Sequence, residues 1–151
     1  MSAPLHLTIT TPAAVLVDRA DIASVRAEDE SGGFGILPGH ADLLTVLPPS
    51  VVRWRGADRV ERYCVVGGGV LTVTGGRMVA IACRQGTTGD DLVQLEADVA
   101  TMRAAEADAD RRARVEQMRL HAHAVRQLMR YLRPGQAGAA QPEAVPDEDA
   151  A

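Results

Sequence analysis

The sequence predicts an α+β protein in two parts, an N-terminal antiparallel β-sandwich followed by a C-terminal α-helical hairpin, with a short tail. Three observations predict this. Residues 1–89 carry short runs of Val, Ile, Leu and Thr that are broken by Gly, Pro and Asp. Residues 90–133 contain neither Gly nor Pro and are rich in Ala and Arg. Residues 134–151 contain four acidic residues, no Arg and no apolar periodicity.

The first part is typical of many short antiparallel strands. Eight or more such strands in fewer than 90 residues indicate a sandwich or a flattened barrel, because a smaller sheet would leave its apolar face in water. Turn residues separate the runs, among them Pro38-Gly39, Pro48-Pro49, the glycines at 67–69 and Gly75-Gly76. The predicted strands are residues 5–10, 13–17, 22–27, 43–47, 50–55, 62–66, 70–73 and 78–82.

The second part carries two narrow apolar seams at helical spacing. The first runs from Leu92 to Met102 and the second from Val115 to Leu132. Their phases do not join, because heptads continued from the first seam would place Glu106 and Glu116 in it. We therefore expect two helices folded as a hairpin, with one long helix containing a stutter as the alternative.

Charge is distributed unevenly over these helices. Residues 90–110 carry seven acids and only Arg103, whereas residues 111–133 carry seven arginines and only Glu116. Antiparallel packing would set one row against the other, although exposed pairs contribute only about 0.3–0.5 kcal/mol each. Two solvated faces, or an Arg-rich helix that meets an acidic surface on another subunit, are the alternatives.

Composition excludes several classes of protein. There is no Lys, so neither a Walker A loop nor Schiff-base chemistry is possible. The net charge of −4 and the pI near 5.5 argue against a nucleic-acid-binding protein. No apolar stretch has the length of a membrane span, and the N-terminus lacks the features of a signal peptide, so we expect a soluble chain that is not exported. Cys64 and Cys83 are expected to be buried free thiols.

No set of residues forms a recognisable catalytic motif. The glycines near residue 35 miss the GxGxxG spacing and open no predicted helix. His40 has only Asp42 nearby at ligand spacing, so a metal site is not expected. No Ser lies in a GxSxG elbow. We expect a non-catalytic protein without a cofactor, whose tail at 134–151 is disordered.

Two segments resemble a known family. The sequence GILPGHADLLT at 35–45 and the sequence VVGGGVLTV at 65–73 closely resemble the epsilon subunit of F-type ATP synthases, in both order and separation. The opening run LHLTITTP at 5–12 fits the same family, and the resemblance covers about residues 4–133. The segments at 26–30 and 125–134 look most like the variant of the alternative, N-type bacterial ATPases.

This resemblance implies a subunit of the central stalk, peripheral to the cytoplasmic face of the bacterial plasma membrane. Its partners would be the gamma subunit, the c subunits of the rotor ring, and the alpha/beta catalytic head. The sandwich at 1–89 would dock on the rotor, and the helices at 90–133 would restrain ATP hydrolysis when they extend. Rotor-ring contacts would come from Phe34, Gly35, Pro38, Gly39 and His40, unless these residues merely shape a turn. Head contacts would come from Arg111, Arg112, Arg114, Arg119, Arg126, Arg130 and Arg133.

The chain departs from the family pattern at several positions. Gly33 stands where the family often carries Glu, and Cys83 replaces an acid at the end of a strand. The pattern with which some relatives bind ATP has Asp and Arg where this chain has Ala100 and Asp110, so ATP binding is not expected. The rival hypothesis is a free-standing β-sandwich that binds a ligand and dimerises through its helices. That rival predicts a concave polar site within residues 1–89.

Overall fold

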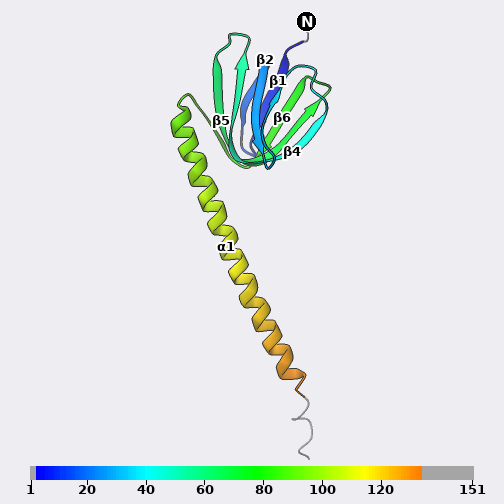
Figure 1. Ribbon diagram of the computed structural model, residues 1–151, viewed down its shortest axis with the longest axis vertical. Helices are drawn as coiled ribbons and strands as arrows, with labels where there is room; N and C mark the ends of the chain where they lie inside the picture. The colour runs from blue at the N-terminus through cyan, green and yellow to red at the C-terminus, as the bar shows by residue number, and fades with distance from the viewer. Residues whose placement is uncertain (1–2, 134–151) are drawn as a thin grey trace, which may run out of the picture. The chain divides into compact units, whose positions relative to one another are not determined.

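The computed structural model describes residues 3–133 (Figure 1). The chain divides into two compact units, Met1–Asp108 and Ala109–Ala151. The first unit therefore includes the beginning of the helical region, whereas the sequence analysis placed its boundary at residue 89. The tail predicted to be disordered lies outside the described residues.

Seven strands form one sheet that closes on itself. The hydrogen-bonded order is β1-β6-β5-β4-β2-β3, and an additional pairing of β1 with β2 completes a ring. All strand pairs are antiparallel except β1 with β6. The strands are β1 (Leu5–Thr10), β2 (Val15–Asp29), β3 (Gly32–Ile36), β4 (Leu43–Gly56), β5 (Glu61–Thr74), β6 (Met78–Cys83) and β7 (Gly86–Gly89).

The three long strands take part in both layers of the sandwich. In one layer, residues 25–29 of β2 pair with β3, residues 50–55 of β4 pair with the first half of β5, and that half also pairs with β7. In the other layer, residues 15–22 of β2 pair with β1, and β1 pairs with β6. Strand β6 then pairs with the second half of β5, which pairs with residues 43–47 of β4. We call the first the helix-side layer and the second the opposite layer.

The number of strands differs from the sequence prediction. Each long strand replaces two predicted ones, because Pro48-Pro49 and the glycines at 67–69 lie within β4 and β5 rather than in turns. These two segments face each other, since Pro49 pairs with Gly67 and Leu47 with Gly69. Here the two strands pass together from one layer into the other. Strands β3 and β7 were not predicted, because their Gly- and Thr-rich sequences lack an alternating apolar pattern.

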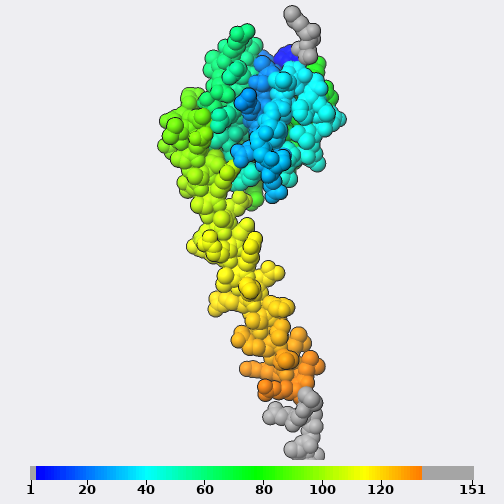
Figure 2. Space-filling model, viewed as in Figure 1, coloured from blue at the N-terminus to red at the C-terminus, as the bar shows by residue number. Residues whose placement is uncertain are grey.

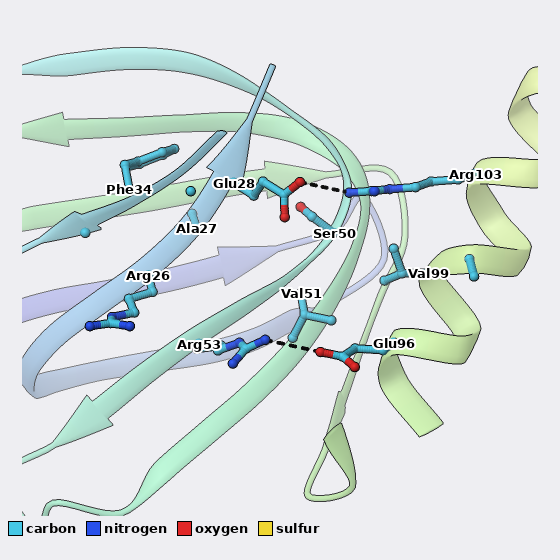
Figure 3. Close-up of a pocket in the computed structure, with 13 residues that line it drawn as sticks. Arg26, Ala27, Glu28, Phe34, Ser50, Val51, Arg53, Glu96, Val99 and Arg103 are labelled. Atoms are coloured by element: carbon cyan, nitrogen blue, oxygen red, sulfur yellow. Dashed lines mark hydrogen bonds and ion pairs between the residues drawn. The ribbon is translucent and has the colours of Figure 1, made fainter. Parts of the chain in front are cut away.

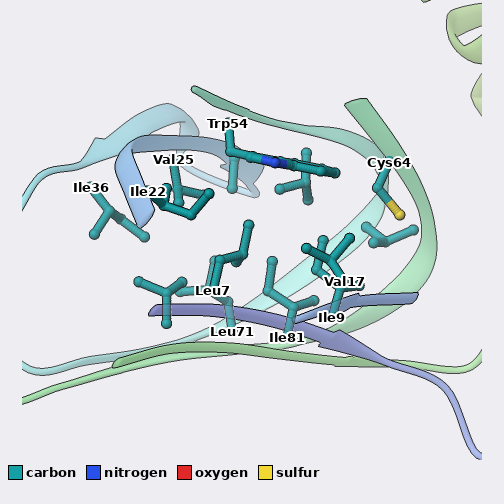
Figure 4. Close-up of a cluster of buried hydrophobic side chains, with 14 of the residues drawn as sticks. Leu7, Ile9, Val17, Ile22, Val25, Ile36, Trp54, Cys64, Leu71 and Ile81 are labelled. Atoms are coloured by element: carbon teal, nitrogen blue, oxygen red, sulfur yellow. The ribbon is translucent and has the colours of Figure 1, made fainter. Parts of the chain in front are cut away.

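The core lies between the two layers (Figure 4). The opposite layer contributes the alternate residues Leu5, Leu7 and Ile9 of β1, each fully buried. The helix-side layer contributes Trp54 and Val52. Cys64 and Cys83 are buried free thiols, as predicted. Burial raises the pKa of the Cys64 thiol to about 12.

Residues 92–131 form one continuous helix, α1 (Leu92–Tyr131), so the predicted hairpin is not observed. Asp91 caps its start, because its Oδ1 accepts hydrogen bonds from the backbone N–H groups of Val93 and Gln94 at 3.0 and 3.3 Å. Leu95 and Val99 of the first seam are buried against Val65 of β5. Figure 2 shows the first turns of α1 in contact with the strands.

Two physical reasons explain the absence of a hairpin. The first seam already packs on the sheet, so its two central residues are not available to a second helix. The segment between residues 103 and 114 also consists of good helix formers and contains no Gly or Pro to reverse the chain. The alternative of one long helix is the one that the structure adopts. Within residues 3–133, no helix combines the length and hydrophobicity that a membrane span requires.

Candidate functional site

The predicted rotor-contact residues Pro38, Gly39 and His40 lie together in one tight turn between β3 and β4. The His40 backbone N–H donates to the Leu37 carbonyl at 3.1 Å, and the His40 Nδ1 lies 2.6 Å from the Ala41 carbonyl oxygen. The side chain of Leu37 is 62% exposed, whereas that of His40 is half-buried. The prominent apolar side chain of this turn is therefore Leu37, which the sequence analysis did not single out.

A second turn holds this one in place. The Gly39 backbone N–H donates to the Gly76 carbonyl at 2.8 Å, and the Gly75 N–H donates to Asp42 Oδ1 at 2.8 Å. A Cβ atom on Gly76 would lie only 2.9 Å from the Gly39 Cα, so the two turns can approach this closely only with glycine there. The two turns therefore form a fixed double-turn corner at one end of the opposite layer.

Phe34 and Gly35 do not belong to this corner. They lie in β3, where Phe34 pairs with Ala27 and Gly35 pairs with Arg26. The ring of Phe34 is half-buried and packs against the main core. We therefore assign Phe34 to the core in the isolated chain, and the five predicted contact residues separate into a strand pair and a turn.

The outward face of the opposite layer is uncharged over most of its area, and His6 and Asp18, which contact each other, lie beside Met78 and Thr8 at its β1–β2 side. We call the uncharged part the bare face. Cross-strand neighbours on it are Val46 and Val70, Val70 and Ala82, and Leu44 and Thr72. Leu44 is 71% exposed and Val46 is 67% exposed. The bare face consists of Thr8, Thr10, Val15, Leu44, Val46, Val70, Thr72, Met78, Ala80 and Ala82. A contiguous apolar surface of this kind is typical of an interface.

The outward face of the helix-side layer is charged and partly covered by α1 (Figure 3). Arg53 contacts Glu96 at 3.2 Å, and Arg103 contacts Glu28 at 3.4 Å. The Arg103 Nε also donates to the Pro49 carbonyl at 2.8 Å. A groove of about 700 Å³ lies between these residues. Its charged groups are largely engaged with one another across the groove, which ties α1 to the sandwich.

The seven predicted head-contact arginines lie in the second unit. All seven are exposed. Arg119 contacts Glu116 at 3.8 Å, one helical turn away. Apolar side chains accompany the arginines, since Met118 and Met129 are 72% and 63% exposed. Exposed arginines and exposed apolar side chains thus lie together on this helical segment.

An ion-paired cluster closes the β4–β5 turn. Asp58 accepts from Arg62 Nη2 at 2.6 Å and from the Val60 backbone N–H at 3.1 Å. These hydrogen bonds, with that from Arg62 the larger cause, lower the pKa of Asp58 from 3.8 to about 2. The ionised Asp58 therefore contributes stability that is fully present above pH 3.8 and is lost as the pH falls through about 2.

We expect a carboxyl-carbon NMR titration to place the Asp58 midpoint near pH 2, and to shift it upward in Arg62→Gln, to between about 2 and the ordinary value of 3.8 because the Val60 N–H still donates to Asp58. The reason is that the substitution removes the charged donor while the turn remains. Arg84→Gln, which removes an arginine from a different turn, serves as the control and should leave the midpoint near 2. An unchanged midpoint in Arg62→Gln would show that the ion pair is not formed in solution.

Sequence reasoning missed the bare face and the double-turn corner. The bare face combines residues from five strands, and its members become neighbours only through the register of the strands. A signal was present nevertheless, because Leu44, Val46 and Val70 are apolar at positions that alternate with buried ones. The corner was missed because Gly75-Gly76 and the turn at 38–40 are far apart in the sequence.

Comparisons with known proteins agree with this architecture. Residues 4–87 match the family described as ATP synthase, Delta/Epsilon chain, beta-sandwich domain. A protein of Paraburkholderia xenovorans named ATP synthase epsilon chain 2 is 59% identical over 92% of this chain and 100% of its own length. A protein of the same name from Cereibacter sphaeroides is 52% identical over 85% of this chain and 88% of its own.

Solved structures show the same fold at low identity. A chain in the cryo-EM structure of the Euglena gracilis mitochondrial ATP synthase, OSCP/F1/c-ring, superposes with a TM-score of 0.56 at 21% identity, over 69% of this chain and 66% of that one. The match to a family over more than half of the chain, together with relatives more than half identical along most of their length, shows that the chain belongs to the epsilon chain family of ATP synthase.

Proposed function

We propose that this chain is the non-catalytic epsilon subunit of an ATP synthase central stalk, in which it couples ion-driven rotation of the rotor to ATP synthesis and hydrolysis in the catalytic head. Family membership carries the proposal. It takes precedence over the rival of a free-standing ligand-binding sandwich, and the charged groups that line the groove beside α1 are largely paired with one another. The subunit would be peripheral, at the cytoplasmic face of the bacterial plasma membrane.

The bare face is the proposed docking surface for the gamma subunit. Its central residues Val46 and Val70 remain exposed to water in the isolated chain. Covering such a surface is favourable by about 25 cal/mol for each Å² of apolar area removed from water. The outward face of the helix-side layer is a poorer candidate, because α1 and the ion pairs of Arg53 and Arg103 already cover part of it.

The double-turn corner is the proposed contact with the c subunits of the rotor ring. A backbone hydrogen bond from Gly39 to Gly76 and a hydrogen bond from the Gly75 N–H to the Asp42 carboxylate hold it in one conformation, so little conformational entropy is lost when it docks. Leu37 adds an exposed apolar side chain beside the predicted residues Pro38, Gly39 and His40. Of the predicted set, Phe34 would act indirectly, by packing β3 on the core.

The arginine-rich half of α1 is the proposed contact with the alpha/beta head. The seven exposed arginines suit an acidic surface, and such a contact would restrain ATP hydrolysis by stabilising one of two positions of the helix. The names of the two bacterial relatives, epsilon chain 2, support assignment to the alternative, second-copy ATPase. Ala100 and Asp110 continue to argue against ATP binding.

Co-purification with the gamma subunit tests docking through the sandwich, and ATPase assays test the restraint of hydrolysis by α1. The variants are the full chain and a truncation that ends at Asp108, the boundary of the first unit. Ending the chain at Gly89 would instead uncover Val65 by removing Leu95 and Val99. We expect both forms to co-purify with gamma, and the assembled enzyme with the truncated form to hydrolyse ATP about fivefold faster or more.

The two measurements can contradict the two proposals independently. Loss of co-purification for both forms would contradict docking through the sandwich. Retained co-purification with an unchanged hydrolysis rate would contradict restraint by the helix and leave the docking proposal in place. The folded state of the truncated chain is checked by its β-sheet circular dichroism spectrum before either assay.

A further inference from the structure

Four arginines form a stripe along the second half of α1 and just beyond its end. Arg119 and Arg126 are seven residues apart, which places them on the same face of the helix. Arg130 follows Arg126 by four residues, and Arg133 follows Arg130 by three. We call these four residues the arginine stripe. All four are exposed, and Arg119 also contacts Glu116 at 3.8 Å.

The acidic residues at the start of α1 cannot neutralise this stripe. Side chains on one helix contact each other only when they are three or four residues apart. Asp110, the last of those acids, lies nine residues before Arg119, which is about 13.5 Å along the axis. That separation exceeds the Debye length of about 8 Å at physiological ionic strength. Because α1 is continuous, the two charge rows do not face each other.

The chain carries a second acidic segment that can reach the stripe. Residues 134–151 lie outside the described part of the structure, and their sequence contains four acids and no basic residue. The acids are Glu143, Asp147, Glu148 and Asp149. They equal the arginine stripe in number and have the opposite sign. They also begin only ten residues after Arg133.

The length of the linking chain matches the length of the stripe. From Arg133 to Asp147 there are fourteen residues, a number that can bridge a distance of about 20 Å. From Arg119 to Tyr131, where α1 ends, there are twelve residues, which span about 18 Å along the helix. The acids can therefore fold back over the whole stripe, and the covalent link gives them an effective concentration in the millimolar range.

We propose that the acidic segment at 143–149 docks in cis on the arginine stripe and competes there with acidic partners. Individual exposed ion pairs are weak and are screened by salt, so the contact is reversible. The docking itself stands independently of the ATP synthase. The competition rests on the proposed function, because there the stripe contributes to the contact with the acidic surface of the head.

Paramagnetic relaxation enhancement tests the docking in the full chain. A nitroxide is attached at Ala150→Cys, while Cys64 and Cys83 stay unlabelled because they are buried. We expect the amide signals of residues 119–130 to broaden in about 10 mM salt and to recover in about 1 M salt, where the Debye length falls from about 30 to about 3 Å. The matched control carries the same label with Glu143→Gln, Asp147→Asn, Glu148→Gln and Asp149→Asn.

The control separates attraction from simple proximity. Broadening that is equal in the charged and neutralised chains, or absent from both, would overturn the docking. Mixing nitroxide-labelled chains with unlabelled ¹⁵N chains detects a tail that binds a second copy. Broadening that arises only between chains would overturn docking in cis. The substitutions lie outside residues 3–133, and the amide spectrum of those residues shows whether the fold is unchanged.

A fluorescent polyglutamate peptide of about twenty residues serves as the probe for competition. We expect it to bind the neutralised chain about three- to tenfold more tightly than the natural one at low salt, and about equally at high salt. Equal affinity at low salt, or binding to neither chain, would overturn the competition. Because neither measurement requires the assembled enzyme, failure of the proposed stalk function and failure of this inference are distinguishable.

Discussion

A glutamate in place of Val70 should abolish stable binding of this chain to the gamma subunit while leaving its fold intact. Val70 lies at the centre of the bare face, between Val46 and Ala82, and is 40% exposed. In the isolated chain the carboxylate can stay in water, so the cost to folding is small. In the complex the same carboxylate would be buried without a partner, at a cost of several kcal/mol. We expect the affinity for gamma to fall about 100-fold or more.

Arg26→Gln is the matched control for this substitution. It changes the net charge by the same amount, −1, but lies on the outward face of the helix-side layer. We expect it to leave the affinity for gamma nearly unchanged. Dissociation constants for the natural chain and both variants, measured by titration with purified gamma, decide the matter. Comparable losses in both variants would indicate a general charge effect, and no loss in Val70→Glu would place the interface elsewhere.

The substitution Gly69→Ala should lower the stability of the protein more than the same substitution at any other glycine of the sandwich. A Cβ atom there would collide with the carbonyl oxygen of Ala82 and would lie 3.0 Å from the Cα of Cys83. Both atoms belong to the backbone of β6, which pairs with β5 at this point and cannot move aside without breaking the ladder. We expect a free energy of unfolding lower by about 3 kcal/mol or more.

Gly68→Ala is the informative comparison, because the neighbouring glycine is required for a different reason. Gly68 has a φ of +83°, but a Cβ atom there would meet nothing closer than the Leu47 carbonyl oxygen at 3.8 Å. The expected cost is therefore only the left-handed backbone conformation, about 1–2 kcal/mol. Urea denaturation of both variants measures the difference. Equal losses would show that β6 can shift to make room at Gly69.

The family and the two-part organisation could be predicted from the sequence, because both depend on local features. The turn at 38–40 and the strand containing the glycines at 67–69 carry the resemblance. The helical part was recognisable because 40 consecutive residues form α1 without an interrupting Gly or Pro. The buried thiols were also predictable, since Cys64 and Cys83 lie in apolar, alternating runs.

The candidate site was predicted only in part. The turn at 38–40 was identified, but it is supported by the turn at Gly75-Gly76, which is more than thirty residues away and is bound by Asp42. Phe34 was grouped with the contact residues because it is close in sequence, whereas the fold turns its ring toward the core. Closeness in the sequence could not separate core residues from contact residues, because successive residues of a strand point to opposite faces of the sheet.

What the sequence determined by itself is the type of each segment: apolar alternation for strands, and uninterrupted helix formers for α1. Only the tertiary structure decided where the segments join and which faces stay uncovered. Pro48-Pro49 and Gly67–69 look like turns locally, yet they pair with each other inside two long strands. The apolar seam of α1 could have packed on a second helix or on the sheet, and burial of Leu95 and Val99 against Val65 selected the sheet. Such choices depend on contacts between distant residues, which local patterns do not contain.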